Sequence, residues 1–218
     1  MKAIIIGATG LVGGGLTKLL AEHSLVTQVE VFTRRDLGMT HPKVKVHLVD
    51  FEKVDLWKDK LKGDVLFSAL GTTLKAAGSK EKQYLVDHDY QLKVSESAAL
   101  NGVKTYVLIS SVNADPKSPF FYLRMKGELE NKIASIPFHS INILRPGPLK
   151  GEREGVRIKE VLTNKLLDLF PQTLLKPGLR PIDALKVSQV ALRAGLRAEP
   201  GIHVIGPGEI HEWSSKTF

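Results

Sequence analysis

The stretch Gly7-Ala8-Thr9-Gly10-Leu11-Val12-Gly13 decides the fold class, because it follows a short apolar run at 2–6 and opens a row of apolar residues with helical spacing. Gly7 gives the backbone freedom that a tight turn needs, Gly10 lets the chain approach a pyrophosphate, and Gly13 lets the helix pack close to the strand. The free amide groups at the start of such a helix bind phosphate. The order of strand, turn and helix therefore predicts a dinucleotide-binding unit, the alternative being a glycine turn that only connects two elements.

Short apolar runs continue along the chain and alternate with rows of helical spacing. The runs predict strands at 2–6, 29–32, 44–48, 65–69, 105–109, 140–144 and 202–205, and most are continuous rather than alternating, as in parallel strands buried on both faces. Helical rows follow the first run, span 86–98 and lie between residues 120 and 135. This pattern predicts one α/β domain over residues 1–218, a doubly wound and mostly parallel Rossmann sheet of about seven strands with helices on both faces. The Pro- and Gly-interrupted segment 149–180 is expected to be an excursion that covers the substrate.

The composition of the 218 residues excludes several kinds of site. There is no cysteine, which excludes disulfides, thiolate zinc sites, iron–sulfur clusters and a cysteine nucleophile. The seven histidines show no metal-ligand spacing, so no metal is expected. The net charge of +8 is scattered, which indicates a solvated basic surface and, in part, a bound phosphate. A nucleic-acid partner is the alternative, and steep salt dependence of binding would identify it.

The beginning of the sequence gives an expectation about location. Only three or four apolar residues precede Gly7, too few for a secretory signal or a membrane span. We therefore expect a cytoplasmic protein, a monomer or homodimer, whose partner is a small-molecule substrate.

The end of the second strand indicates which dinucleotide is bound. Enzymes that bind NAD carry an acidic residue there for the ribose 2′-hydroxyl, whereas this strand ends in Thr33-Arg34-Arg35. Either arginine can form charge-assisted hydrogen bonds with a 2′-phosphate, so NADP(H) is expected to be preferred over NAD(H). Asp36 would be the missing acid if the strand ended later.

A tyrosine and a lysine at helical spacing are the candidate reacting groups. Tyr122 and Lys126 stand at i and i+4, hence on one helix face, and a lysine cation lowers the cost of removing a phenol proton. Tyr122 can act as a general acid toward a carbonyl oxygen, and Lys126 can hydrogen-bond the nicotinamide ribose. Ser111 ends the fifth strand at the same sheet edge and can hydrogen-bond the substrate oxygen. Each feature alone is common, but their order along the chain predicts an active site.

Two more strand ends are expected to border the cofactor. Asp50 and Phe51 follow the third strand, where an adenine ring would lie, and the segment Ala69-Leu70-Gly71-Thr72-Thr73 follows the fourth, beside the ribose and pyrophosphate. For both segments the alternative is an ordinary loop.

Four segments together resemble the atypical short-chain dehydrogenases/reductases, in particular the Tat-interactive oxidoreductase-like branch. They are 7–13, Leu108-Ile109-Ser110-Ser111, the stretch from Phe121 to Glu128, and Leu144-Arg145-Pro146-Gly147-Pro148-Leu149. The resemblance runs from Met1 to about Gly195 and implies a single NADP(H)-binding domain.

The same resemblance implies roles for individual residues. Thr9, Gly10, Leu11 and Val12 would hold the pyrophosphate, Arg34 and Arg35 the 2′-phosphate, Tyr122 would be the active-site residue with Lys126 on the ribose, and Leu149 would lie near the nicotinamide. Classical members hold a relay water with an Asn after the fourth strand, where this chain has Asp87-His88-Asp89.

These features together predict an NADPH-dependent oxidoreductase that reduces a small carbonyl, quinone or similar substrate. The alternative is an NADPH-sensing regulatory or scaffold protein with a vestigial active site. The two differ in turnover, because only the first would oxidise NADPH in the presence of a carbonyl or quinone.

Overall fold

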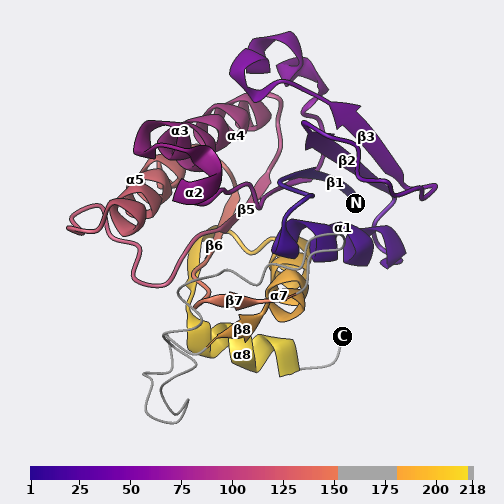
Figure 1. Ribbon diagram of the computed structural model, residues 1–218. Helices are drawn as coiled ribbons and strands as arrows, with labels where there is room; N and C mark the ends of the chain where they lie inside the picture. The colour runs from indigo at the N-terminus through magenta and orange to yellow at the C-terminus, as the bar shows by residue number, and fades with distance from the viewer. Residues whose placement is uncertain (152–180, 216–218) are drawn as a thin grey trace.

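Seven parallel strands form the central sheet of the computed structural model, which describes residues 1–151 and 181–215 (Figure 1). The strands are β1 (Lys2–Ile6), β2 (Gln28–Thr33), β3 (Val44–Leu48), β4 (Val65–Ser68), β5 (Thr105–Ile109), β6 (Ser140–Leu144) and β9 (Gly201–Ile205). Their order is β3-β2-β1-β4-β5-β6-β9, so the chain starts near the middle and winds to one edge and then to the other. The expected doubly wound α/β sheet is confirmed.

In the middle of the sheet, β4 and the part of β1 from Ala3 onward are buried, because helices cover both faces. In β1, Ala3 to Ile6 are 0% exposed, and Ile5 pairs with Val31 on one side and Phe67 on the other. Side chains that point to opposite faces are all apolar here, which is why the sequence reads as a continuous run rather than as an alternation.

One face of the sheet packs against α1 (Leu11–Glu22) and α7 (Ala184–Arg197), with α8 (Pro207–Ser215) beside α7 (Figure 1). The two main helices approach closely at Gly15, where a Cβ atom would lie 2.9 Å from the Ser188 hydroxyl. That hydroxyl donates a hydrogen bond to the Val12 carbonyl, 2.8 Å away. The C-terminal helix α7 therefore supports the helix that follows the glycine turn.

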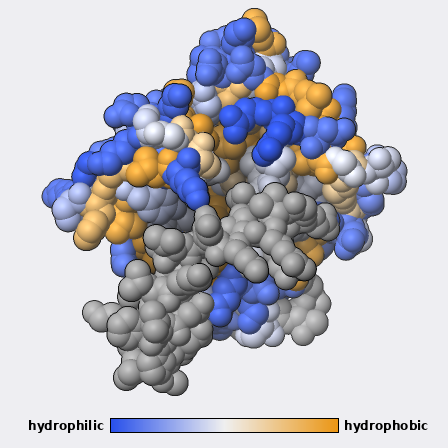
Figure 2. All heavy atoms as spheres, viewed as in Figure 1, coloured by the Kyte–Doolittle hydropathy of each residue, from blue (hydrophilic) through white to orange (hydrophobic). Residues whose placement is uncertain are grey.

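The opposite face packs against α4 (Tyr90–Leu100) and α5 (Phe121–Ala134), together with the 3₁₀ segments η1 (Phe51–Leu56) and η2 (Lys58–Lys60). Two short helices, α2 (Leu74–Ala77) and α3 (Lys80–Tyr84), lead into α4 through a π-helical turn, η3 (Leu85–Asp89). The expected single helical row over 86–98 is therefore divided. Over the α2 to α5 side of the molecule, hydrophobic residues are interspersed with hydrophilic ones (Figure 2).

A small second sheet follows the Pro- and Gly-rich segment after β6. Its strands β7 (Leu149–Lys150) and β8 (Ile182–Asp183) pair in parallel and lead into α7. Of the expected excursion over 149–180, residues 152–180 lie outside the described part of the chain. Within the described ranges, no helix combines the length and the apolar character that a membrane crossing requires.

Candidate functional site

A cavity of about 410 Å³ lies at the carboxyl ends of the central strands. Its lining includes the turn after β1, the end of β2, the segments after β3 and β4, and two residues of α5. Ligands of doubly wound folds bind at this edge, at the point where the strand order reverses. The cavity therefore lies where the glycine turn predicts a cofactor.

The glycine turn is packed too tightly for any other residue type at two positions. Gly7 has a φ of +84°, and a Cβ there would lie 2.3 Å from the Ala69 carbonyl. A Cβ on Gly13 would lie 2.2 Å from the Gly7 oxygen, which in turn accepts a 3.0 Å hydrogen bond from the Gly10 amide. Glycine at these two positions therefore lets the turn pack directly against the backbone after β4 and against the start of α1.

The first turn of α1 has the donor groups that a pyrophosphate needs. Gly10 is the N-cap in an extended conformation, and no side chain caps the helix. The first turn also contains no acidic residue, so nothing in it repels an anion. Since Leu11 and Val12 line the cavity, their amide groups fit a phosphate ligand at this helix end.

Arg34 and Arg35 extend into the same cavity from the end of β2. Thr33 fixes their loop, since its hydroxyl donates to the Arg35 carbonyl (3.0 Å) and accepts from the Arg35 amide (3.3 Å). Asp36 does not line the cavity, and its carboxylate accepts a hydrogen bond from the Gly38 amide instead. The charge that this strand end presents to the cavity is therefore positive.

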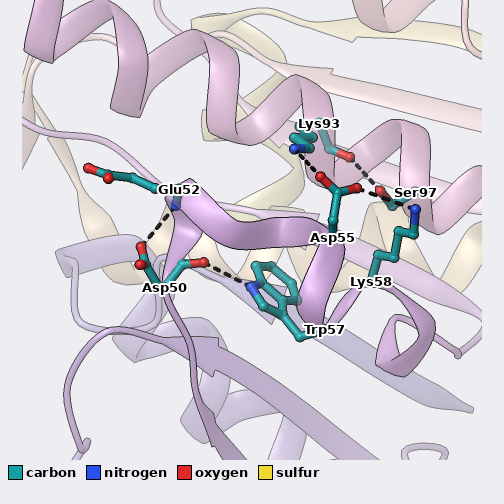
Figure 3. Close-up of polar contacts among 7 residues, drawn as sticks. All are labelled: Asp50, Glu52, Asp55, Trp57, Lys58, Lys93 and Ser97. Carbon is teal, nitrogen blue, oxygen red and sulfur yellow. Dashed lines mark hydrogen bonds and ion pairs between the residues drawn. The ribbon is translucent and has the colours of Figure 1, made fainter.

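The segment after β3 forms the wall on the side expected for adenine. Phe51 lines the cavity, is 3% exposed, and meets the Trp57 ring edge-on at 5.6 Å. Asp50 does not line this cavity; its carboxylate caps η1 at the Glu52 amide, and its carbonyl accepts from the Trp57 indole at 2.9 Å (Figure 3). Asp50 therefore holds this segment in place, and Phe51 is the residue whose side chain faces the cavity.

A set of ion pairs ties this wall to α4. Asp55 on η1 binds Lys93 of α4 at 2.7 Å and Lys58 at 3.3 Å (Figure 3). All three side chains are largely exposed, so each pair contributes little to stability.

Tyr122 and Lys126 face the cavity from one side of α5. Tyr122 is 40% exposed, whereas Lys126 is 3% exposed, so the ammonium is buried and the phenol is open to a ligand. The helix places them one turn apart, as the sequence predicts. A phenol that can give up a proton thus shares the cavity with a buried cation.

The end of β5 presents Ser110, not Ser111, to the cavity. The Ser110 hydroxyl donates to the Glu130 carboxylate of α5, and that carboxylate also binds Arg145 at the end of β6. The Ser111 hydroxyl donates to the Val112 carbonyl at 3.3 Å. The role expected of Ser111 remains a prediction, and Ser110 is the neighbouring hydroxyl that the cavity contains.

Asp87 is an additional carboxylate in the cavity wall. It is 1% exposed, and its Oδ1 accepts a hydrogen bond from the Thr72 amide at 2.6 Å. Burial raises the pKa of Asp87 to about 6, while the nearby Lys126 cation and the Thr72 amide act in the opposite direction. The sequence pointed to this region through Asp87-His88-Asp89, but only the fold distinguishes the buried member that lines the cavity.

The cavity brings together most of the residues expected to bind a cofactor. These are Gly7, Thr9, Gly10, Leu11, Val12, Arg34, Arg35, Phe51, Ala69, Leu70, Gly71, Tyr122, Lys126 and Leu149. Gly13 and Asp50 support the lining from behind it, and their expected cofactor contacts remain predictions. Thr72 and Thr73, which belong to the segment expected beside the ribose and pyrophosphate, also line the cavity. The lining residues that the sequence did not assign to the cofactor are Phe32, Thr33, Ala76, Asp87, Ile109 and Ser110.

Comparison with known proteins identifies relatives along most of the chain. A family model described as HIM1 matches residues 40–177. Protein FMP52, mitochondrial, of Saccharomyces cerevisiae is 40% identical over 156 residues, which cover 70% of this chain and 68% of the yeast protein. The protein of the same name in Emericella nidulans is 35% identical over 206 residues, which cover 90% of this chain and 88% of that protein.

Solved structures share the fold at low sequence identity. MoeE5, in complex with UDP-glucose and NAD, has a TM-score of 0.73 at 16% identity. The match covers 99% of this chain and 81% of the MoeE5 chain. A UDP-galactose 4-epimerase has a TM-score of 0.70 at 17% identity, and the match covers 94% of this chain and 76% of the epimerase chain. These structures share the doubly wound sheet of this chain, and the likeness concerns the fold alone.

The names of the relatives correct the expected location. The proteins from yeast, Emericella nidulans and Candida albicans, at 35–40% identity, are mitochondrial by name, so the expectation of a cytoplasmic protein was wrong. That expectation rested on the short apolar run before Gly7, which argues only against a secretory signal or a membrane span. Mitochondrial targeting segments are basic and amphipathic, and an apolar run does not test for them.

Proposed function

This chain belongs to the family of the FMP52 proteins and the HIM1 model, and from that premise we propose that it is an NADP(H)-dependent oxidoreductase. It would reduce a small carbonyl, quinone or similar substrate by hydride transfer. The observation that carries the proposal is a single cavity lined by the glycine turn, by Arg34 and Arg35, and by Tyr122 and Lys126. The finer resemblance to the Tat-interactive oxidoreductase-like branch is part of this proposal.

The residues of the cavity divide between binding and chemistry. The amides of Leu11 and Val12 would bind the pyrophosphate, and the two arginines would bind the 2′-phosphate through charge-assisted hydrogen bonds. Phe51 offers an apolar surface for adenine. NADPH, when bound, supplies a hydride. The preference for NADPH follows from the positive charge at the end of β2.

The chemical step requires one proton from the protein. Tyr122 donates its phenol proton to the carbonyl oxygen as the carbonyl carbon receives the hydride, so the product is an alcohol. The buried Lys126 ammonium would stabilise the phenolate that remains and would hydrogen-bond the nicotinamide ribose. A hydroxyl at the end of β5 would stabilise the charge that develops on the oxygen.

The test is NADPH oxidation across a panel of carbonyls and quinones by wild type and Tyr122→Phe. Wild type is expected to turn over at least one member, and the variant to lose turnover while its dissociation constant for NADPH stays within about tenfold. Unchanged turnover in Tyr122→Phe would refute the role of Tyr122.

A second candidate, an NADPH-sensing regulatory or scaffold protein, is favoured by one observation. Ser111 does not line the cavity, and its hydroxyl is bonded to the Val112 carbonyl. This candidate predicts tight NADPH binding and no turnover with any member of the panel. The same experiment therefore separates the two.

A further inference from the structure

The edge strand β3 has one side of its backbone free to pair with a further strand. It pairs with β2 on its inner side, and no described strand lies on its outer side (Figure 1). The Lys43 carbonyl accepts a hydrogen bond from β2, and the Val49 amide donates one to β2. Because backbone groups of alternate residues point to opposite sides of a strand, Val46 and Leu48 direct their amides and carbonyls outward. Such an edge is a template for one more strand.

A buried carboxylate fixes this edge against the two strands behind it. Glu30 of β2 is buried, and its carboxylate binds the Lys2 ammonium of β1 at 2.9 Å and the His47 imidazole of β3. The His47 ring also stacks on Phe32 of β2, with 4.6 Å between the ring centroids. A one-residue slip of β3 would break both contacts of His47, so the register of the edge is specified. The outward backbone groups are therefore held in a fixed pattern.

The two faces of β3 differ in chemistry. Val46 packs against the core on the α1 side, and Leu48, two residues further along the same face, is 66% exposed. The opposite face carries Lys45 and His47, because side chains alternate along a strand. Lys45 is exposed and forms no ion pair within the described part of the chain. An added strand would thus meet apolar side chains on one face and a cation on the other.

A second cavity, of about 450 Å³, runs along this edge. Residues 46–50 form one side of it, and the segments η1 and η2 form the other. Trp57, between these two segments, stacks on the same Phe32 ring as His47, so the segments cover the His47 face of the sheet. An extended chain beside β3 would direct every second side chain into this cavity.

The wall of this second cavity is positively charged. Lys53 and Lys60 line it, and both are exposed. Lys53 lies 3.9 Å from Asp50 in a pair whose side chains are both more than half exposed, and Lys60 has no ion partner among the described residues. Asp50 is the acidic residue of the lining, and its carboxylate caps η1. With Lys45 on the same face of the strand, three lysines surround the edge.

We propose that this edge binds an extended acidic segment of another protein, in which acidic and apolar residues alternate. The segment would add a strand to β3 through the outward amides and carbonyls of Val46 and Leu48. Its apolar side chains would lie over Leu48, and its carboxylates would lie beside Lys45, Lys53 and Lys60. The inference does not depend on the proposed oxidoreductase activity.

Charge argues against a second copy of this chain as the occupant. Pairing of two β3 strands would place the Lys45 side chains of both copies along one face, and like charges on neighbouring strands are destabilising. Lysines on an edge strand can also serve only to prevent pairing with other chains. That role predicts that no peptide binds to the edge, so a binding experiment separates it from the proposal.

Binding is measured by fluorescence anisotropy with a labelled synthetic peptide of about seven residues that alternates glutamate and valine. The full chain is expected to bind it at least about tenfold more tightly than a peptide that alternates lysine and valine. The double variant Lys53→Glu/Lys60→Glu should bind the glutamate peptide at least about tenfold more weakly than wild type does.

The matched control is the double variant Lys117→Glu/Lys132→Glu, which makes the same change in net charge at two exposed lysines before and on α5. It is expected to bind the glutamate peptide as wild type does. No binding to wild type, or an equal loss in the two double variants, overturns the inference.

Amide hydrogen exchange in the full chain, followed by NMR, distinguishes strand addition from simple attraction of charge. With saturating glutamate peptide, the amides of Val46 and Leu48 are expected to exchange at least about tenfold more slowly than in the free protein. The amides of Lys45 and His47 point toward β2 and serve as the internal control, with rates that change by less than about threefold. Bound peptide that leaves the Val46 and Leu48 rates unchanged, as adsorption to the lysines alone would, overturns the inference.

Discussion

Arg145 at the end of β6 binds Glu130 of α5 through both carboxylate oxygens, each 3.1 Å from its Nε atom. The Glu130 side chain is 5% exposed and also accepts a hydrogen bond from the Ser110 hydroxyl. Because Glu130 lies one turn beyond Lys126 and two beyond Tyr122, this contact fixes the helix face that carries both candidate reacting groups. The position of α5 against β5 and β6 therefore depends on one buried carboxylate.

Glu130→Gln is expected to destabilise the protein, because it leaves the Arg145 guanidinium without its charged partner. The expected loss is about 3 kcal/mol in the free energy of unfolding, as for other broken buried pairs, and urea denaturation of wild type and variant would measure it. Glu199→Gln is the control, since its pair with Arg197 is exposed and is expected to change stability by less than about 1 kcal/mol. Equal losses in both variants would contradict this role of Glu130.

Gly13→Ala is expected to disrupt the close contact between α1 and the glycine turn. The added Cβ would lie 2.2 Å from the Gly7 oxygen, so the helix start must move. We expect a loss of about 2 kcal/mol or more in stability and of NADPH binding. Gly208→Ala, where a Cβ meets nothing within 4 Å, should leave both unchanged or slightly improved. Wild-type affinity in Gly13→Ala would count against a phosphate site at this turn.

The raised pKa of Asp87 predicts how stability depends on pH. Since the pKa is about 6 in the folded chain and near 3.9 when unfolded, the folded state binds the proton more tightly. The stability of wild type relative to Asp87→Asn is therefore greatest below about pH 4 and falls by about 2 to 3 kcal/mol as the pH rises through the folded pKa. Urea denaturation of both proteins over this range measures the difference. A constant difference would contradict the raised pKa.

Replacing Arg34 and Arg35 together by Ala is expected to weaken NADPH binding by about a hundredfold and to leave NADH binding within about threefold, because only NADPH carries the 2′-phosphate. NADH is thus the matched control ligand for the same variant. Equal losses for both dinucleotides would mean that the arginines support the fold of this edge and do not read the phosphate.

The sheet could be predicted from the sequence because its signals are local. Each apolar run at 2–6, 29–32 or 105–109 is long enough to be a strand, and every expected end lies within one residue of the observed end. The glycine spacing further requires a strand before it and a helix after it. For these elements, local preference and tertiary packing agree.

The details of the site could be predicted only in part, since they depend on which side of a strand or helix faces the cavity. Ser110 and Ser111 are adjacent at a strand end, and the sequence alone does not decide which of them points inward. The apolar row over 86–98 does not reveal the π-helical turn that directs Asp87 into the wall. The Glu130–Arg145 contact joins residues whose proximity only the packing of α5 on β6 creates.

The most direct test of the account is the ratio of the dissociation constants of NADPH and NADH for the wild-type chain, measured by isothermal titration calorimetry. The amides after Gly10, the wall at Phe51, and the arginines at the end of β2 predict that both bind and that NADPH binds at least about tenfold more tightly. Tighter binding of NADH, or no binding of either dinucleotide, would contradict it.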